Sequence, residues 1–512
     1  MTTLIINGTV VTRDQERPFI AEGAVAFEGE RIVAVGDSTE LLGRFAGVDG
    51  GVAAGVDAGV AAGVSAGVRI MDARGRLVMP GFINAHMHYY STFARGIDFG
   101  GRPATTFGEI LSGLWWKLDK MLTLEDVYYS AVGPMIDAVR MGVTSVIDHH
   151  ASPSAVRGSL FEIARAAKLM GLRSNLCYEV SDRDGTAVAR EGIAENVDFA
   201  RSCKEQGGRA GDTAGREGDS QGAPPAGRAG DTAGRGGDLP SNSANRAGDA
   251  RRDSSNRDML GGLMGMHAQM TISPETMDAV VEAAQDVGVG YHIHAAEGIE
   301  DVVDSLAKHG VRVIERLDDC GILGPGSLVV HCVHVTDDEI ALLAQSGVAV
   351  VNNPESNMSN AVGCSPVLRM LDAGVLVGMG TDGYCVDMTE SLRAVHAIQK
   401  HAAGLPCVAW AEPHQMLFEN NREIFNRLIE GEVGVLRPGA YADVVIVGYQ
   451  APTPVLESTV ASHLLFGVSG RNVDTTIING RVVMEERELI GIDEEQLMAR
   501  SREQAAKLWA RI

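Results

Sequence analysis

The stretch LVMPGFINAHMH, residues 77–88, is an apolar run that ends in two histidines, His86 and His88. Side chains two positions apart on a strand point to the same face, so the two imidazoles are expected to converge. Neutral imidazole is a good ligand for Zn²⁺ and Fe²⁺. An HxH pair alone is equally compatible with ordinary surface or core histidines, so its meaning depends on the strands that follow.

Seven more short apolar runs follow, and each ends in polar residues: VTSVIDHH (143–150), LRSNLCYEV (172–180), LMGMHAQ (263–269), VGYHIHAAE (289–297), SLVVHCVH (327–334), VAVVNNPESN (348–357) and VLVGMGTDG (375–383). Amphipathic stretches of helical period separate them, for example 124–141 and 274–287. Alternation of this kind predicts an α/β fold, a (β/α)₈ TIM-like barrel. The polar residues gather at the carboxyl ends of the strands, the face on which barrel active sites lie.

The two ends of the chain have a different pattern. Residues 3–35 and 439–483 alternate apolar and polar side chains between turn signals, which predicts one small flanking β-sandwich built from both ends. We therefore expect residues 1–75 and 431–512 to form the sandwich, with a terminal helix after residue 493. Residues 76–430 are expected to form the barrel.

Two low-complexity insertions interrupt these units. Residues 47–68 repeat Gly-Val-x-x, which fits neither strand nor helix and predicts a surface loop. Residues 204–257 contain GRAGDTAGR twice and almost no large apolar side chains. Such a segment cannot bury enough surface to offset the entropy of ordering, so we expect it to be disordered and non-catalytic.

Composition excludes several functional classes. The net charge of −23 argues against a nucleic-acid-binding protein, which needs a basic surface. The first residues lack the features of a signal peptide, and no run of 18 apolar residues predicts a membrane span. Seven scattered cysteines without a CxxC pair predict neither a disulfide framework nor a thiolate zinc site. A cytoplasmic homodimer is the expectation for a chain of this size and composition.

Further candidate metal ligands come from later strand ends. His294 and Glu297 lie in HIHAAE, His331 begins HCVH, and Asp382 lies in GTDG. Together with the HxH pair, histidines and a carboxylate from separate strand ends predict a four-ligand or water-bearing metal site. His292 shares the strand face of His294, but its deeper position favours a packing role.

At this point a family resemblance is plain. The stretches PGFINAHMH, HIHAAE, HCVH, NNPESNMSN and GTDG resemble the deaminase and chlorohydrolase branch of the amidohydrolase superfamily. RGI (95–97), LWWKLDK (114–120) and SVIDHHASP (145–153) are similar to the SsnA-type aminohydrolases in particular. The resemblance covers nearly the whole chain outside the two insertions, and it implies a hydrolytic metal centre in a barrel.

The resemblance also assigns roles to individual residues. It implies that Glu297 shuttles protons, that His331 holds the attacking water, and that His267 touches the substrate. Branches with two metals bridge them through a carbamylated lysine at the fourth strand end, where this chain has His267 and no lysine within 261–271. We therefore expect one divalent ion, Zn²⁺ with Fe²⁺ as the alternative. Its implied ligands are His86, His88, His294 and Asp382, and Asp382 is also placed to accept the water proton.

The substrate is less well defined by the sequence. Trp115 and its neighbour Trp116 can stack on a flat ring or pack between helices. Glu179 can accept hydrogen bonds from ring N–H groups, and Asn357 is either a substrate contact or a helix cap. The expected function is hydrolysis of a C–N bond in a small purine- or pyrimidine-like heterocycle, by deamination or ring opening. The alternatives are a guanine-type deaminase, a dechlorinating hydrolase, and, outside enzymes, a scaffold or a heterocycle sensor.

Overall fold

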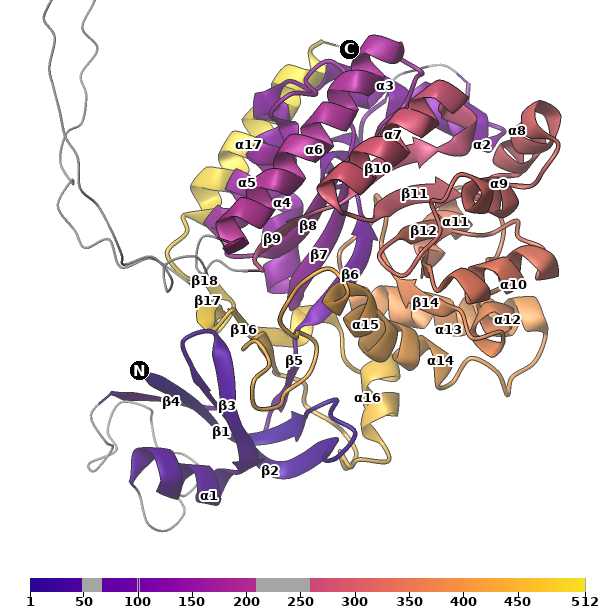
Figure 1. Ribbon diagram of the computed structural model, residues 1–512. Coiled ribbons are helices and arrows are strands. Elements are labelled where there is room, and N and C mark those ends of the chain that lie inside the picture. Colours follow the sequence, from indigo (N-terminus) through magenta and orange to yellow (C-terminus); the bar gives the residue numbers. More distant parts are fainter. Residues whose placement is uncertain (48–66, 99, 101, 209–257, 512) are drawn as a thin grey trace, which may run out of the picture.

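The computed structural model describes residues 1–47, 67–98, 100, 102–208 and 258–511 (Figure 1). Most of the two predicted insertions, residues 48–66 and 209–257, lies outside the described residues. The second insertion was expected to begin at residue 204, but helix α6 (Thr186–Gly208) continues through that point. No helix in the described ranges combines the length and the apolarity that crossing a bilayer requires.

The barrel prediction is confirmed by eight parallel strands in the described part of the chain. They are β6 (Phe82–Met87), β7 (Val143–His150), β8 (Arg173–Tyr178), β10 (Met264–Ala268), β11 (Tyr291–Ala295), β12 (Leu328–His331), β13 (Ala349–Asn352) and β14 (Leu376–Met379). They form two arcs, β6 to β8 followed by the short β9 (Leu260–Gly262), and β10 to β14. Single bridges from Val180 to Met266 and from Met87 to Asp382 join the arcs and close the barrel.

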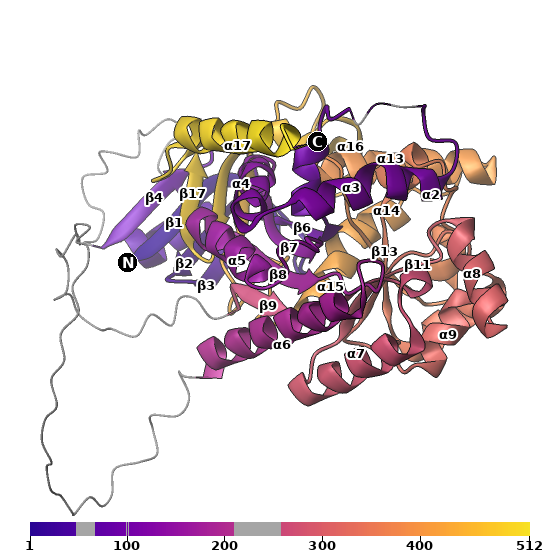
Figure 2. The same cartoon turned by 90° about the horizontal axis from the view of Figure 1, so that it is seen from above.

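Helices cover the outside of the strands, as Figure 2 shows from above. The longer ones, besides α6, are α4 (Leu124–Arg140), α5 (Ser159–Met170), α7 (Pro274–Val287), α8 (Ile299–His309), α9 (Val313–Asp319), α10 (Asp337–Ser346) and α13 (Met388–Ala403). Local sequence sets their ends: Thr123 and Asp126 form a capping box at the start of α4, and Ser273 caps α7 before Pro274. The helices predicted over 124–141 and 274–287 are thus confirmed.

Short helical turns fill the connections. They are α1 (Ser38–Leu41), η1 (Leu42–Ala46), η2 (Tyr89–Ala94), α2 (Phe107–Ile110), η3 (Leu111–Trp115), α3 (Trp116–Leu118), η4 (Asp119–Met121), η6 (Gln269–Thr271), α11 (Pro354–Ser359), α12 (Val367–Asp372), α14 (Glu412–His414), η7 (Gln415–Asn420), α15 (Asn421–Asn426), α16 (Val460–Phe466) and η8 (Gly470–Asn472). The run from α2 to η4 lines a cavity together with residues at the carboxyl ends of the strands. The predicted terminal helix is α17 (Glu494–Trp509).

Both chain ends enter one predominantly antiparallel sheet, as predicted. Its strands in the described residues are β1 (Thr2–Val11), β2 (Phe19–Glu28), β3 (Arg31–Asp37), β4 (Val68–Asp72), β5 (Leu77–Pro80), β15 (Val444–Val447), β16 (Val473–Ile478), β17 (Arg481–Glu485) and β18 (Glu488–Leu489). Strand β5 pairs with β1 on one side and with β15 on the other, so it joins the two ends. The boundary expected after residue 75 therefore precedes a strand that belongs to this sheet.

A buried ion pair connects the barrel to this sheet. Arg173 on β8 is fully buried, and its Nε lies 3.2 Å from Oδ2 of Asp443, just before β15. Its Nη1 also donates to the Asp258 carbonyl at 2.7 Å, and its Nη2 to Asn479 Oδ1 at 3.3 Å. Such a pair fixes the relative position of two elements only while both partners are present, because either charge alone is costly to bury.

Replacing Asp443 by Asn is therefore expected to lower the free energy of unfolding by about 3–5 kcal/mol, since it leaves the Arg173 charge buried and uncompensated. Urea unfolding followed by circular dichroism measures the change. The matched control is Asp474→Asn, which breaks the partly exposed pair with Arg76 and should cost at most about 1 kcal/mol. Equal effects of the two substitutions would contradict the role of the buried pair.

Candidate metal centre

The carboxyl ends of β6, β11 and β14 bring four side chains to one point. His88 Nε2 lies 3.1 Å from Asp382 Oδ1 and 3.3 Å from His294 Nε2. His86 Nε2 lies 3.9 Å from the same carboxylate oxygen. Ligand atoms at about 2.0–2.2 Å from one ion are separated by distances of this order. Three of the predicted ligands, His86, His88 and Asp382, thus have ligand atoms within 4.8 Å of one another, and His294 lies beside His88.

Hydrogen bonds orient the three imidazoles in the same sense. The Nδ1 atoms of His88 and His294 lie against the backbone carbonyls of His149 and His267, and His86 Nδ1 lies 2.9 Å from His292 Nε2. Each ring therefore turns its Nε2 toward the shared point. His86 Nε2 is buried and has no hydrogen-bond partner among the described residues. Because an unpaired buried polar atom is costly, this donor set fits a divalent ion.

Backbone geometry around Asp382 favours this convergence. Asp382 has a φ of +56°, a left-handed conformation that non-glycine residues seldom adopt. Its N–H donates to the His86 carbonyl at 3.0 Å, which ties the end of β14 to β6. Gly380 allows this approach, since a Cβ there would lie 2.6 Å from the same carbonyl oxygen. Strained residues of this kind persist where neighbouring contacts hold them, as is common at functional sites.

Glu297 and His331 lie beside the four converging side chains. His331 Nε2 lies 3.5 Å from Glu297 Oε2 and 3.7 Å from Asp382 Oδ2, and it has no hydrogen-bond partner in the described part of the chain. Burial, with the added negative charge of Asp382, raises the pKa of Glu297 well above its usual value. A carboxyl of this kind suits general acid–base chemistry.

Three of the four predicted substrate residues line the small cavity over this cluster. The cavity has a volume of about 50 Å³, and Trp115, Glu179 and His267 face it together with Trp116. The Glu179 carboxylate lies 3.8 Å from His149 Nδ1 and 3.9 Å from His267 Nε2. Burial raises the pKa of Glu179 to about 7, against the opposing effect of the nearby Arg183 guanidinium.

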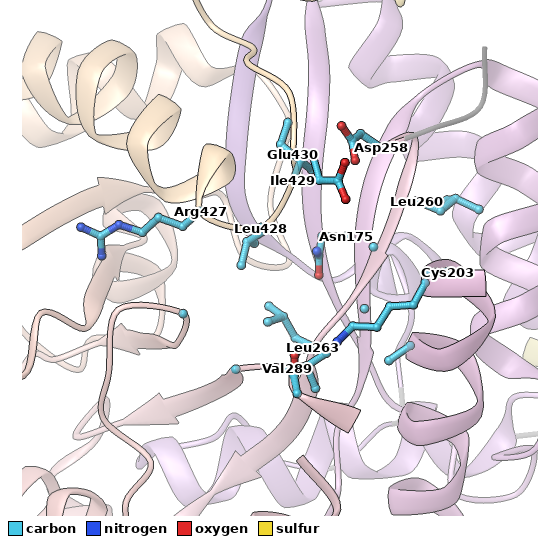
Figure 3. A pocket seen from close by; sticks show the side chains of 17 residues that line it. Asn175, Cys203, Asp258, Leu260, Leu263, Val289, Arg427, Leu428, Ile429 and Glu430 are labelled. Atoms are coloured by element: carbon cyan, nitrogen blue, oxygen red, sulfur yellow. Dashed lines mark hydrogen bonds between the residues drawn. The ribbon is translucent and has the colours of Figure 1, made fainter. Parts of the chain in front are cut away.

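A larger cavity lies elsewhere. It has a volume of about 590 Å³ and is lined by Asn175, by residues of β9 and by the segment that follows α15 (Figure 3). Those residues lie at the amino ends of the barrel strands, opposite the convergence of His86, His88, His294 and Asp382. Barrel enzymes carry their chemistry at the carboxyl ends, so the smaller cavity is the candidate active site.

Comparison with known proteins decides the family. A model described as "Amidohydrolase family" matches residues 77–483. The chain belongs to the amidohydrolase family. This amidohydrolase is therefore a metal-dependent hydrolase that acts on carbon–nitrogen bonds.

Two curated relatives match this amidohydrolase over almost its whole length. They are a 5-methylthioadenosine/S-adenosylhomocysteine deaminase of Pelotomaculum thermopropionicum, 27% identical over 99% of both chains, and a 5'-deoxyadenosine deaminase of Methanosarcina mazei, also 27% identical over 99% of both. Two solved structures share its fold. An adenosine deaminase from Xanthomonas campestris with bound zinc has a TM-score of 0.76 and 21% identity, covering 99% of this chain and 98% of that one. The E. coli guanine deaminase has a TM-score of 0.68 and 17% identity, covering 94% and 99%.

The fourth predicted substrate residue of the amidohydrolase faces elsewhere. Asn357 is buried outside the lining of the small cavity, and its Oδ1 accepts a hydrogen bond from His331 Nδ1 at 2.8 Å. This contact leaves His331 Nε2 directed toward Glu297 and Asp382. The placement supports a positioning role for Asn357 and gives no support to the predicted substrate contact.

Sequence reasoning missed several residues at this site. Tyr90, Phe107, Leu111 and Asn360 also line the small cavity. Phe107 and Leu111 are four positions apart, on one face of a helical turn just before LWWKLDK, and this spacing is a signal that could have identified them. Arg183 forms a buried ion pair with Asp119 in η4 and lies 5.4 Å over the Trp116 ring. The partners of that pair are 64 residues apart, so no local pattern indicates it.

Proposed function

We propose that this amidohydrolase deaminates a small aminated heterocycle, purine-like in shape, by attack of water on the ring carbon that bears the amino group. The observation that carries the proposal is the convergence of Glu297, His331 and Asp382 beside the three imidazoles, under a cavity with indole walls. The two curated relatives, a 5-methylthioadenosine/S-adenosylhomocysteine deaminase and a 5'-deoxyadenosine deaminase, support the same reaction class.

We assign one divalent ion, Zn²⁺ in the first instance, to His86, His88, His294 and Asp382. The zinc bound in the similar adenosine deaminase structure supports this choice. When bound, an ion of this kind makes water acidic enough to attack near neutral pH. The donor set of three imidazoles and one carboxylate is typical of such sites, and His267 in place of a bridging lysine supports a single ion.

The chain's own residues supply the proton transfers. Asp382 accepts the first proton of the attacking water. His331 orients that water through Nε2, because Asn357 holds the proton on Nδ1. Glu297 delivers a proton to the ring nitrogen next to the attacked carbon and so makes that carbon more electrophilic. The proton accepted by Asp382 then passes to the amino nitrogen, the C–N bond breaks and ammonia leaves. The added hydroxyl gives its proton back to Glu297 and becomes the ring carbonyl. General acid–base help of this kind contributes roughly 10²–10⁴ in rate.

Aromatic and polar walls position the ring in this account. Trp115 and Trp116 line the cavity, and Trp116 Nε1 is buried without a hydrogen-bond partner among the described residues. Glu179 and His267 line the same cavity, where the carboxylate can accept hydrogen bonds from ring N–H groups.

The segment from α2 to η4 has to move before such a ring can enter. A cavity of about 50 Å³ is far smaller than the roughly 300–1,000 Å³ of ligand pockets in general. Phe107 and Leu111 of this segment line it, and they pack with Val333 and Val362 in a small cluster separate from the main core. A cluster this small can open without unfolding the barrel.

A screen of heterocycles tests the proposed function. The purified protein, loaded with Zn²⁺, is mixed with adenosine, 5'-methylthioadenosine, guanine, cytosine and an amino-triazine. Ammonia is measured with a coupled assay, and ring absorbance is followed in parallel. We expect ammonia release from at least one aminated ring and none after chelation of the metal. Absence of ammonia from every ring, with the metal fully bound, would refute deamination.

A further inference from the structure

The three converging imidazoles differ in what holds their far nitrogens. The Nδ1 atoms of His88 and His294 are hydrogen-bonded to backbone carbonyl oxygens, which cannot change protonation. The Nδ1 atom of His86 is instead hydrogen-bonded to a side chain, the imidazole of His292 on β11, with 2.9 Å between His86 Nδ1 and His292 Nε2. Both rings are completely buried. Because a histidine ligand is oriented by the group that its far nitrogen contacts, His292 bears on which nitrogen of His86 carries the proton.

The hydrogen bonds around His292 can be given directions by counting protons. If His86 Nε2 is to bind an ion, His86 must carry its proton on Nδ1 and donate it to His292 Nε2. The neutral His292 ring then carries its own proton on Nδ1, which lies 3.5 Å from Cys177 Sγ on β8. The Cys177 thiol donates in turn to the Asp148 carbonyl oxygen, at 3.5 Å. In this series of hydrogen bonds, from His86 through His292 and Cys177 to Asp148, each donor has one acceptor.

We propose that His292 and Cys177 are positioning residues of the metal centre, which hold His86 in the tautomer that leaves Nε2 free for the ion. The inference rests on the proposed metal site and is independent of the substrate. It adds a hydrogen-bonding role to the packing role expected for His292 from its depth in the barrel. It also gives a function to the fully buried Cys177, whose pKa burial raises well above the usual value, so that the thiol keeps its proton.

Packing alone is the competing explanation, and His292 does pack. Its ring stacks on that of His149, with 4.5 Å between centroids and 21° between planes. A phenylalanine at residue 292 keeps the flat shape but removes both nitrogens. A glutamine removes the ring but keeps an acceptor that can reach His86 Nδ1. The two substitutions therefore separate the hydrogen bond from the shape.

The experiment compares His292→Phe, His292→Gln and Cys177→Ala with the wild type. The Zn²⁺ affinity of each metal-depleted protein is measured by competition with a chromogenic chelator, and Co²⁺ is added separately to record the visible spectrum of the site. We expect His292→Phe to weaken Zn²⁺ binding about 10–100-fold and to alter the Co²⁺ spectrum. His292→Gln should retain most of the affinity, and Cys177→Ala should weaken binding by less than His292→Phe.

Controls separate this effect from a general loss of structure. Cys203→Ala, on α6 away from the site, should leave Zn²⁺ affinity unchanged. Thermal unfolding of the metal-depleted proteins shows which variants remain folded, and if His292→Phe does not fold, His292→Gln and Cys177→Ala carry the test. Wild-type affinity in both His292→Phe and Cys177→Ala overturns the proposal, as does a glutamine variant as weak as the phenylalanine variant. Failure of the wild type to bind Zn²⁺ would instead refute the proposed metal site.

Discussion

Replacing Glu297 by Gln is expected to lower ammonia release by about 10²–10⁴-fold while the metal content stays at the wild-type level. Glutamine has almost the same shape, but it cannot give a proton to a ring nitrogen. Glu297 Oε2 lies 3.5 Å from His331 Nε2, close to the reacting point but beyond the four assigned ligands. Turnover should therefore fall without loss of the ion.

The measurement combines steady-state ammonia release with elemental analysis of the same sample. Glu275→Gln, on the exposed first turn of α7, is the matched control and should behave as the wild type. A Glu297→Gln enzyme that works within tenfold of the wild type would remove Glu297 from the proton transfers. Loss of the metal together with activity would instead make Glu297 a ligand.

Replacing Asp382 by Asn should have the largest effect of all, because it removes two functions at once. We expect ammonia release to fall by at least about 10³-fold, since the variant loses both a metal ligand and the acceptor of the water proton. The Asp382 carboxylate is held by hydrogen bonds from Ser356 Oγ at 2.6 Å and from the Gly383 N–H at 2.7 Å. An amide at this position keeps the size of the side chain but gives up its charge.

Ammonia release and Zn²⁺ affinity are measured together for this variant as well. Asp372→Asn, on the exposed end of α12, serves as the control and should change neither quantity. The account predicts that excess Zn²⁺ does not restore Asp382→Asn, because the proton acceptor is still missing. Full recovery at high Zn²⁺ would mean that Asp382 acts as a ligand only.

The sequence was sufficient to predict the architecture because the architecture depends on local patterns. Buried parallel strands appear as apolar runs, and amphipathic helices carry the 3.6-residue period with recognisable caps, as at Thr123. Alternation at both chain ends predicted the flanking sheet. The prediction that the disordered insertion begins at residue 204 was wrong, because α6 continues to Gly208. The composition of the following repeat obscured this last turn of the helix.

The site residues were predictable from the sequence only where a single strand end carries a recognisable motif. HxH and HIHAAE are short motifs, and the strand period indicates the direction of their side chains. The partners of those side chains are set by contacts between distant parts of the chain, such as His86 with His292, which are 206 residues apart. Two further features likewise depend on packing, which no local pattern encodes. They are the hydrogen bond between Asn357 and His331 and the placement of Phe107, in the segment from α2 to η4, at the small cavity.

The most direct test of the central claim is a titration of the metal-depleted protein with Zn²⁺, in which ammonia release from the ring identified by the screen is measured at each addition. A single-ion hydrolase predicts that activity rises linearly from near zero and levels off at one Zn²⁺ per chain. A break at two ions per chain, or ammonia release that does not depend on the metal, would contradict the account.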